Sequence, residues 1–345
     1  MSFEELSARK QRILQVLIDR YTATAIPVSS KDIQEQYLPE CSSATIRSEM
    51  KTLEEMGYLV KTHISSGRLP SPKAYKIYVD RLMQAVQLTE SELDQLKNHF
   101  DSKYYGLEDI IKSTAKIISD VTNYTSIVVL DEASDLLVDS IKIVDLGANL
   151  ALVIIVTESG IISDKTIIIP QDINSNYFNI ANEMINRIFA GKTLREIYAL
   201  REDLTLELNQ FKDLFNNIID LLSEYSRNPR VFLEGASKIL EYPEYNNVGQ
   251  VKQFMALIES KEQLRKLITD NGEIQVQMRI GKADSGIDNC SIVTAKYSIG
   301  GHELGQAGVI GPENMNYSKV LAVLDYVANT LNSFKNNKDD NTDKE

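Results

Sequence analysis

The sequence contains very little cysteine and no tryptophan: only Cys41 and Cys290 occur in 345 residues, without Cys-x-x-Cys spacing. This excludes a disulfide framework and a cysteine-based zinc site, and it suits a reducing compartment. No apolar run reaches the roughly eighteen residues of a membrane helix, and residues 1–12 lack the apolar stretch of a signal peptide. We therefore expect a cytoplasmic protein that makes no use of a membrane.

Catalytic signatures are also missing. The three histidines have no metal-ligand spacing, and no nucleophile motif occurs (His63, His99 and His302). The glycines near the carboxyl end lack the pattern of a phosphate-binding loop and predict a turn instead (Gly300, Gly301, Gly305, Gly308 and Gly311). We expect no catalytic residue, no metal and no cofactor.

The net charge of −12 is distributed unevenly along the chain. Residues 1–80 carry eleven Lys or Arg against ten Asp or Glu, and residues 41–76 carry six against three. Binding to a DNA duplex depends on basic groups that displace counterions from phosphates. The charge pattern therefore favours a nucleic-acid contact near the amino terminus and an acidic remainder.

The first part of the chain predicts a series of short helices. Residues 6–22 place apolar side chains on one helical stripe, which indicates a buried first helix. Ser29 followed by Asp32 fits a capping box that opens a second helix. A third helix begins at Ser42 or Ser43 and stops at Gly57, which can adopt the left-handed conformation past a helix end.

The third helix has one apolar and one polar face. The polar face and its flank hold small, hydroxyl and charged residues (Ala44, Thr45, Arg47, Ser48, Lys51 and Glu55). Arg can bond guanine, Ala or a Thr methyl can touch thymine, and Ser, Thr and Lys can hold phosphates. The pattern favours a recognition helix, although by itself it equally fits an ordinary amphipathic surface helix.

A hairpin is predicted directly after this helix. Residues 58–64 are β-prone, residues 65–68 predict a turn, and residues 69–70 resume an extended chain. Such a wing reaches phosphates or the minor groove, which suits small and basic residues. We place Ser66, Gly67 and Arg68 at the wing, with His63 either against DNA or an ordinary surface histidine.

Two groups of motifs carry a resemblance to a known family. They are SATIRSEM (43–50), LEEMGYL (53–59), HISSGRLP (63–70) and YKIYVD (75–80), and, downstream, CSIVTAKY (290–297), GVIGP (308–312) and MNYSKV (315–320). These motifs resemble the bacterial heat-inducible transcription repressors of the HrcA family. The resemblance extends over nearly the whole chain.

The resemblance implies a homodimeric repressor that binds double-stranded DNA at an inverted-repeat operator, CIRCE, ahead of chaperone operons. It also implies release on heat shock and dependence on the chaperonin GroEL. The DNA-binding residues that we expect are Ser43, Ala44, Thr45, Arg47, Ser48, Lys51, His63, Ser66, Gly67 and Arg68.

The implied architecture is an α+β multi-domain fold. It has an N-terminal winged helix-turn-helix and a GAF-like α+β domain, into which a dimerisation domain of antiparallel sheet plus helices is inserted. The expected ranges are 1–80 for the winged helix, 81–107 for a helical linker, 108–134 and 228–334 for the GAF-like domain, 135–227 for the insertion and 335–345 for a disordered tail.

Local patterns in the body give more specific expectations. β-rich stretches separated by turns predict an antiparallel meander followed by helices (141–146, 150–157 and 161–169). Further on, residues 231–268 predict a long helical stretch and residues 317–334 a closing helix. Residues 273–280 and 291–297 predict strands before the glycine-rich turn.

Two other functions stay open at this point. A winged-helix regulator whose GAF-like domain binds a small effector would share the same amino-terminal pattern. A structural adaptor could use a winged helix for protein contacts. The adaptor would show little salt dependence toward DNA, whereas an operator-binding protein would show a steep one.

Overall fold

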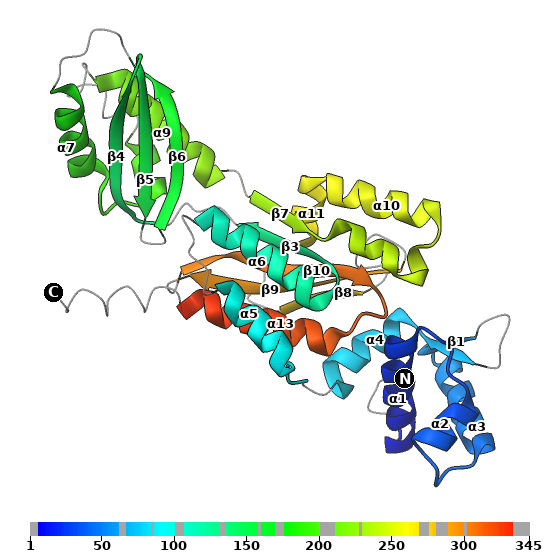
Figure 1. The fold of residues 1–345 in the computed structure, drawn as a ribbon. Coiled ribbons are helices and arrows are strands. Elements are labelled where there is room, and N and C mark those ends of the chain that lie inside the picture. Colours follow the sequence, from blue (N-terminus) through cyan, green and yellow to red (C-terminus); the bar gives the residue numbers. More distant parts are fainter. Residues whose placement is uncertain are drawn as a thin grey trace.

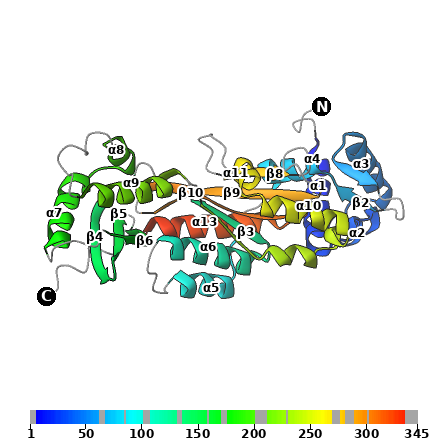
Figure 2. The ribbon, with the colours of Figure 1, turned by 90° about the horizontal axis from the view of Figure 1, so that it is seen from above.

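The computed structural model is elongated, with an amino-terminal unit at one end, a three-stranded sheet at the other and a five-stranded sheet between them (Figures 1 and 2). It describes residues 6–61, 67–83, 86–100, 107–130, 136–157, 160–169, 176–200, 211–227, 230–268, 276–280, 289–299 and 302–333. The combination of helices with antiparallel sheets confirms the α+β class. Within these ranges, no helix has the length and apolar character needed to cross a membrane.

The amino-terminal unit consists of three helices and a hairpin. In chain order its elements are α1 (Ala8–Thr24), α2 (Ser30–Gln36), α3 (Ser43–Glu55), β1 (Leu59–Lys61) and β2 (Arg68–Pro70). The two strands pair antiparallel, and Val28 exchanges backbone hydrogen bonds with Arg68, which attaches the hairpin to the helices. Leu17, Ile33 and Leu53, one from each helix, are fully buried in the shared core.

Local sequence signals set the ends of these helices. The Ser29 hydroxyl accepts from the Asp32 backbone N–H at 3.2 Å, and the Asp32 carboxylate accepts from the Ser29 N–H at 3.1 Å, so the predicted capping box is confirmed. The Ser42 hydroxyl caps α3 by accepting from the Thr45 N–H at 3.1 Å. Gly57 has a φ of +78°, as predicted for the left-handed position after a helix.

Four helical elements lead from the hairpin to the central sheet. They are α4 (Pro72–Ile77), a π-helical turn (Tyr78–Leu82), α5 (Glu90–Phe100) and α6 (Leu107–Thr122). The connecting segment is the stretch between the π-helical turn and α5, of which residues 83 and 86–89 are described. Thr89 and Glu92 exchange hydrogen bonds of 2.9 and 3.3 Å, which confirms the expected capping box at the start of α5. Residues 86–89 before this helix are not helical.

The central sheet is antiparallel, with the strand order β7-β3-β10-β9-β8. Its elements are β3 (Thr125–Leu130), β7 (Arg230–Glu234), two 3-10 turns (Ala236–Glu241 and Pro243–Tyr245), α10 (Val248–Glu259), α11 (Lys261–Ile268), β8 (Val276–Ile280), β9 (Cys290–Ile299), β10 (His302–Pro312) and α13 (Tyr317–Ser333).

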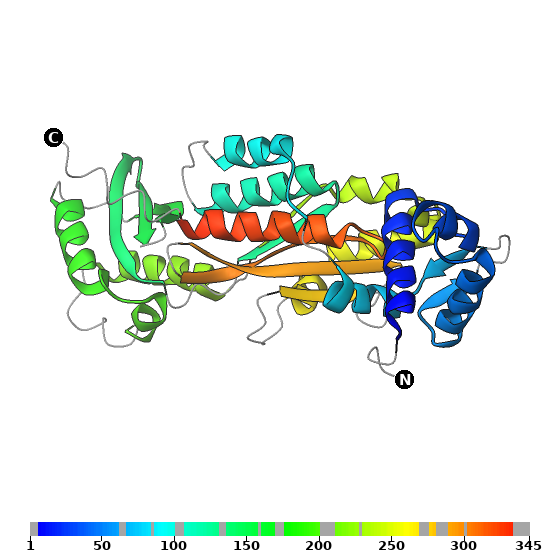
Figure 3. The same ribbon diagram turned by 90° about the horizontal axis from the view of Figure 1, so that it is seen from below.

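Helices cover both faces of this sheet. Helices α6 and α13 lie on one face, with α5 outside α6, and α10 and α11 lie on the other (Figures 2 and 3). Alternate side chains of each strand therefore enter different cores. Val128 and Val293 belong to the core beneath α13, whereas Ile127 and Ile292 belong to the core beneath α10 and α11.

Two expectations for this region are wrong. Residues 231–268 are not one helical stretch, because β7 begins at Arg230 and pairs with β3. Gly305, Gly308 and Gly311, which were expected in a turn, lie in the central strand β10, whereas Gly300 and Gly301 lie outside the described residues. At Gly308, an added Cβ would lie 2.2 Å from the carbonyl oxygen of Val293, so the neighbouring strand leaves no room for a side chain.

The three-stranded sheet is an antiparallel meander, as predicted. The elements of this part are β4 (Val138–Gly147), β5 (Leu150–Thr157), β6 (Gly160–Ile168), α7 (Tyr177–Phe189), α8 (Leu194–Ala199) and α9 (Lys212–Arg227). Asn186 of α7 bonds both backbone groups of Ile141 at 2.7 and 2.8 Å, and Asn182 does the same for Ile143 at 2.9 and 2.8 Å. These amides close the edge of β4 against further strand pairing.

Candidate nucleic-acid interface

Helix α3 presents a polar face to solvent. Ala44, Arg47, Ser48 and Lys51 are exposed, and the opposite apolar side is buried. Lys51 makes only an exposed contact of 3.6 Å with Glu55 on the next turn, which contributes little to stability. The Arg47 guanidinium has no hydrogen-bond or ion-pair partner among the described residues. The face that the sequence predicts for base contact is therefore accessible.

The direction of this face is fixed by Glu49, which is buried between α3 and α1. The Arg9 guanidinium donates to Glu49 Oε1 at 2.5 and 3.1 Å, and Lys10 Nζ lies 3.0 Å from Oε2. Burial raises the pKa of the Glu49 carboxyl, but the hydrogen bonds from Arg9 and Lys10 outweigh it and hold the net pKa below its usual value. The sequence pattern does not reveal this contact, because Arg9 and Glu49 are 40 positions apart.

Hydroxyl groups hold the amino-terminal end of α3 in place. Ser43 Oγ lies 3.1 Å from Ser30 Oγ of α2, and Thr45 Oγ1 lies 2.8 Å from Oγ of the N-cap residue Ser42. Ser43 and Thr45 are both half-buried. They orient the start of the helix, where backbone N–H groups favour phosphate oxygens. Their own contact with DNA stays a prediction.

The base of the hairpin is packed against the helices. Arg68 Nε donates to Glu54 Oε2 of α3 at 2.7 Å, and the Arg68 side chain is only 13% exposed. Gly67 is buried, and an added Cβ there would lie 2.8 Å from the Cβ of Pro27. In the structure, Gly67 and Arg68 thus hold the hairpin in place beside α3.

A basic residue outside the predicted DNA-binding set also lies at the hairpin. Lys61, at the end of β1, is exposed and has no partner in the described part of the chain. Lys73 differs from it, since Lys73 Nζ donates to the Met56 carbonyl at 2.9 Å. His63 and Ser66, which the sequence places at the wing, lie outside the described residues.

The geometry suits contact with a phosphate backbone and base edges. One exposed helix face and one strand end offer the positive groups of Arg47 and Lys61. The basic side chains of Arg9, Lys10 and Arg68 are instead engaged by the carboxylates of α3. Among the described residues, no three His, Cys, Asp or Glu side chains come together as metal ligands.

Comparison with known proteins decides the family. A family model described as the C-terminal domain of the HrcA protein matches residues 108–321, more than half of the chain. A curated relative from Ruminiclostridium cellulolyticum is 36% identical over 337 residues, and one from Brevibacillus brevis is 37% identical over 334 residues.

The chain belongs to the HrcA family.

Both of these HrcA relatives are named heat-inducible transcription repressor HrcA. The matches cover 95% and 94% of this chain and 97% of each relative, so they include the amino-terminal unit that the HrcA family model leaves out. A crystal structure described as a hypothetical protein at 2.2 Å resolution has a TM-score of 0.65 at 20% identity, covering 96% of this chain and 98% of that chain. That similarity supports the fold of this HrcA chain over nearly its full length.

Proposed function

We propose that this protein is a heat-responsive transcription repressor that binds an inverted-repeat operator through α3 and the β1–β2 hairpin. The observation that supports this most directly is the exposed face of α3. Arg47 on this face has no partner in the described part of the chain, whereas Glu49 is buried and ion-paired to α1. A side chain that is held outward and left unpaired on a fixed helix suits base recognition.

In this proposal residues 1–80 act as a winged helix-turn-helix. Helix α3 enters the major groove, and the hairpin lies beside the adjacent backbone. Arg47 bonds a guanine and Ala44 contacts a thymine methyl. The phosphate contacts come from the remaining predicted residues and from the strand end (Ser43, Thr45, Ser48, Lys51, Lys61, His63 and Ser66). Gly67 and Arg68 act by positioning the hairpin.

We assign the body two roles that follow from the sheets. The five-stranded sheet and its helices, from 108–134 and 228–334, act as the GAF-like domain. The inserted residues 135–227 act as the dimerisation domain. Residues 81–107 connect this body to the winged helix.

The outer face of the three-stranded sheet supports a homodimer. Cross-strand partners Val144 and Leu152 lie on this face together with Leu150 and Ile168, while the opposite face is buried. Ile168 is 77% exposed and Val144 is 44% exposed. Gathered apolar side chains of this kind mark interaction surfaces. A two-fold symmetric partner fits an inverted-repeat operator.

Family membership supports a heat response, and we extend the proposal to dependence on chaperonin. We propose that warming shifts the body to a state that no longer holds two reading units at operator spacing, and that GroEL assists the return to the active fold. Operator binding that persisted well above growth temperature without chaperonin would overturn this mechanism.

The proposal is tested by binding of the purified protein, refolded with and without chaperonin, to an inverted-repeat duplex and to a scrambled duplex over a salt series. We expect tight binding to the repeat that falls steeply with salt, because neutralised phosphates release counterions. Equal affinity for both duplexes would overturn operator recognition. Salt-independent or absent binding would instead favour an adaptor. Control by a small effector is a second candidate function, and a groove between α13 and α5 supports it.

A further inference from the structure

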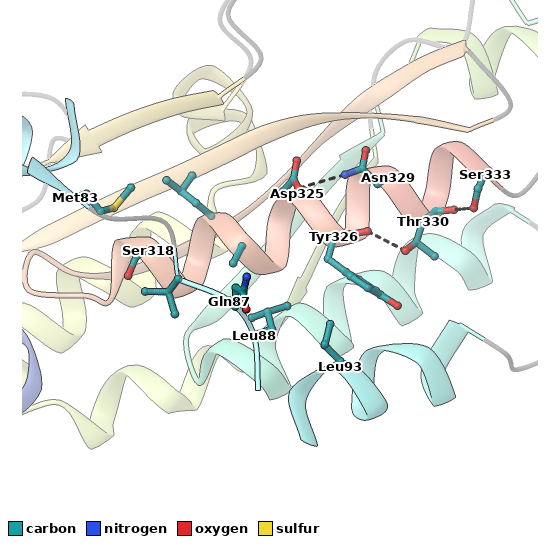
Figure 4. A pocket seen from close by; sticks show the side chains of 13 residues that line it. Met83, Gln87, Leu88, Leu93, Ser318, Asp325, Tyr326, Asn329, Thr330 and Ser333 are labelled. Carbon is teal, nitrogen blue, oxygen red and sulfur yellow. Dashed lines mark hydrogen bonds between the residues drawn. The ribbon is translucent and has the colours of Figure 1, made fainter. Parts of the chain in front are cut away.

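An open groove runs along the outer face of α13 (Figure 4). Its volume is about 890 Å³, within the size range of ligand pockets. Side chains at successive turns of α13, from Ser318 to Ser333, form one wall. Met83 and Leu88 of the connecting segment and Leu93 of α5 line the other side. The groove therefore lies between the body and the segment that leads to the winged helix.

The two walls are clamped together near one end. Lys319 Nζ of α13 lies 2.6 Å from Glu92 Oε1 of α5, and both side chains are partly buried. The hydrogen bond from Lys319, followed by the backbone N–H of Thr89, lowers the pKa of the Glu92 carboxyl to about 2. The distance between α5 and α13 is thus set within the protein itself, and the groove needs no ligand to form.

The lining of the groove is asymmetric. Apolar groups, including Leu88, Leu93 and Tyr326, lie toward the connecting segment and α5. Asp325 and Asn329 form a polar edge along α13, joined by a hydrogen bond of 3.2 Å. Asp325 is the one charged residue among the described residues that line the groove, and none of them is Lys or Arg. A carboxylate beside apolar surface, with no balancing cation, is complementary to an organic cation with an apolar body.

We propose that this groove binds a single-chain cationic amphiphile, with its alkyl body against Tyr326, Leu88 and Leu93 and its ammonium group at Asp325. The apolar body loses contact with water, and the ammonium group gains a charge-assisted hydrogen bond. An anionic amphiphile of equal length would place its carboxylate against Asp325 and is disfavoured.

Occupancy of the groove is linked to the winged helix through the connecting segment. A second crevice, of about 310 Å³, lies between α1 and the start of α13, and it shares Val86 and Ser318 with the groove. Gln15 and Asp19 of α1 line this crevice. A ligand that displaces Val86, which lines both cavities, therefore changes the contact between α1 and the body. This linkage rests on the proposed DNA-binding function, whereas the binding site itself does not.

The site is tested by calorimetric titration of the full-length protein with decylamine and decanoate, each below its micelle concentration, and with decanol below its solubility limit. We expect one decylamine per chain, bound roughly tenfold more tightly than decanoate. Asp325→Asn should reduce decylamine affinity to that of decanol, and Asp94→Asn, an exposed acid on α5 that does not line the groove, should not. Equal affinity of the three probes, or an unchanged Asp325→Asn variant, would overturn the proposal.

A second variant separates this site from nonspecific binding. Ala322→Trp fills the groove and should abolish decylamine binding, whereas Asn332→Trp on the same helix should leave it intact. Should Ala322→Trp fail to fold by circular dichroism, the comparison of Asp325→Asn with the wild type still tests the site.

The linkage to the winged helix is tested by operator affinity. Decylamine should change operator affinity in the wild type and not in Asp325→Asn. Amine binding with no effect on operator affinity would overturn the linkage alone, and wild-type protein that binds amine but no operator would overturn the proposed function alone.

Discussion

Arg68 Nε donates to Glu54 Oε2 across 2.7 Å, which joins strand β2 to the last turn of α3. The Arg68 backbone also exchanges hydrogen bonds with Val28, so one residue connects the hairpin to two parts of the helical unit. A wing that moved independently of α3 would lose register with the duplex. In the proposed DNA complex, the ion pair therefore gives Arg68 a positioning role.

Replacing Arg68 by Ala should weaken operator binding without changing its dependence on salt. Each lost phosphate contact lowers the slope of log affinity against log salt by about 1, and the buried Arg68 guanidinium is engaged with Glu54. Lys61→Ala, at the exposed end of β1, is the matched comparison and should lower the slope. Anisotropy titrations at four salt concentrations measure both. A lowered slope in Arg68→Ala would show that this guanidinium reaches DNA directly.

If the proposed dimer forms through the outer face of the three-stranded sheet, Ile168→Lys should convert it to a monomer. A charge placed in the apolar face with Val144, Leu150 and Leu152 opposes its burial against a second copy, and Ile168 is exposed enough that the fold of one chain should tolerate it. Sedimentation velocity gives the oligomeric state. Val248→Lys, at another apolar residue that is 69% exposed, is the control. A dimer that survives Ile168→Lys would place the interface elsewhere.

Asn186→Ala should destabilise the three-stranded sheet by about 1–3 kcal/mol, because it leaves the backbone N–H and C=O of Ile141 without their side-chain partners. The opened edge of β4 should also promote aggregation on warming. Urea unfolding and light scattering test these effects. Asn179→Ala on the same helix should change neither, since Asn179 is exposed and, within the described ranges, its side chain bonds only Asn176. Equal behaviour of the two variants would show that the amide contacts with β4 do not stabilise it.

Protein stability should fall as the pH drops below about 6.5, through the titration of His99. Burial lowers the pKa of His99 from 6.5. The hydrogen bond between its Nε2 and the Ser113 carbonyl, 2.7 Å long, acts in the opposite direction and raises the pKa. The charge of Lys116 also lowers the pKa, and that of Asp120 raises it. The unfolded chain binds the proton first, so the contribution is fully present above the unfolded pKa and is lost as the pH falls through the folded pKa. In His99→Gln, the urea concentration at the unfolding midpoint should depend less on pH over this range. A variant with the wild-type pH profile would exclude His99 as the group responsible.

The parts of the fold that the sequence predicted are those that depend on neighbouring residues. The capping boxes at Ser29 and Thr89 join residues three positions apart, and Gly57 acts within one turn of α3. Such signals are complete within a few positions, and the structure confirms them. The meander of β4, β5 and β6 could be predicted for the same reason, because its strands pair in chain order and are joined by short connections.

The parts that were missed depend on distant partners. Strand β7 at Arg230–Glu234 is stabilised by pairing with β3, where Ser126 lies opposite Glu234. Gly308 in β10 fits a strand because the backbone at Val293 approaches too closely for a side chain, although glycine by itself favours turns. At the interface, residue type identified the outward face of α3, but the contacts of Glu49 and Arg68 that orient it required the three-dimensional structure.

The central claim is that α3 reads bases through Arg47. It is tested most directly by affinities of the wild type and Arg47→Ala for a set of inverted repeats, each with one base pair exchanged symmetrically in both half-sites. We expect Arg47→Ala to lose roughly 1–3 kcal/mol of discrimination at one guanine position per half-site and to keep it at the others. Uniform weakening across the whole set, with discrimination unchanged at every position, would contradict base reading by Arg47.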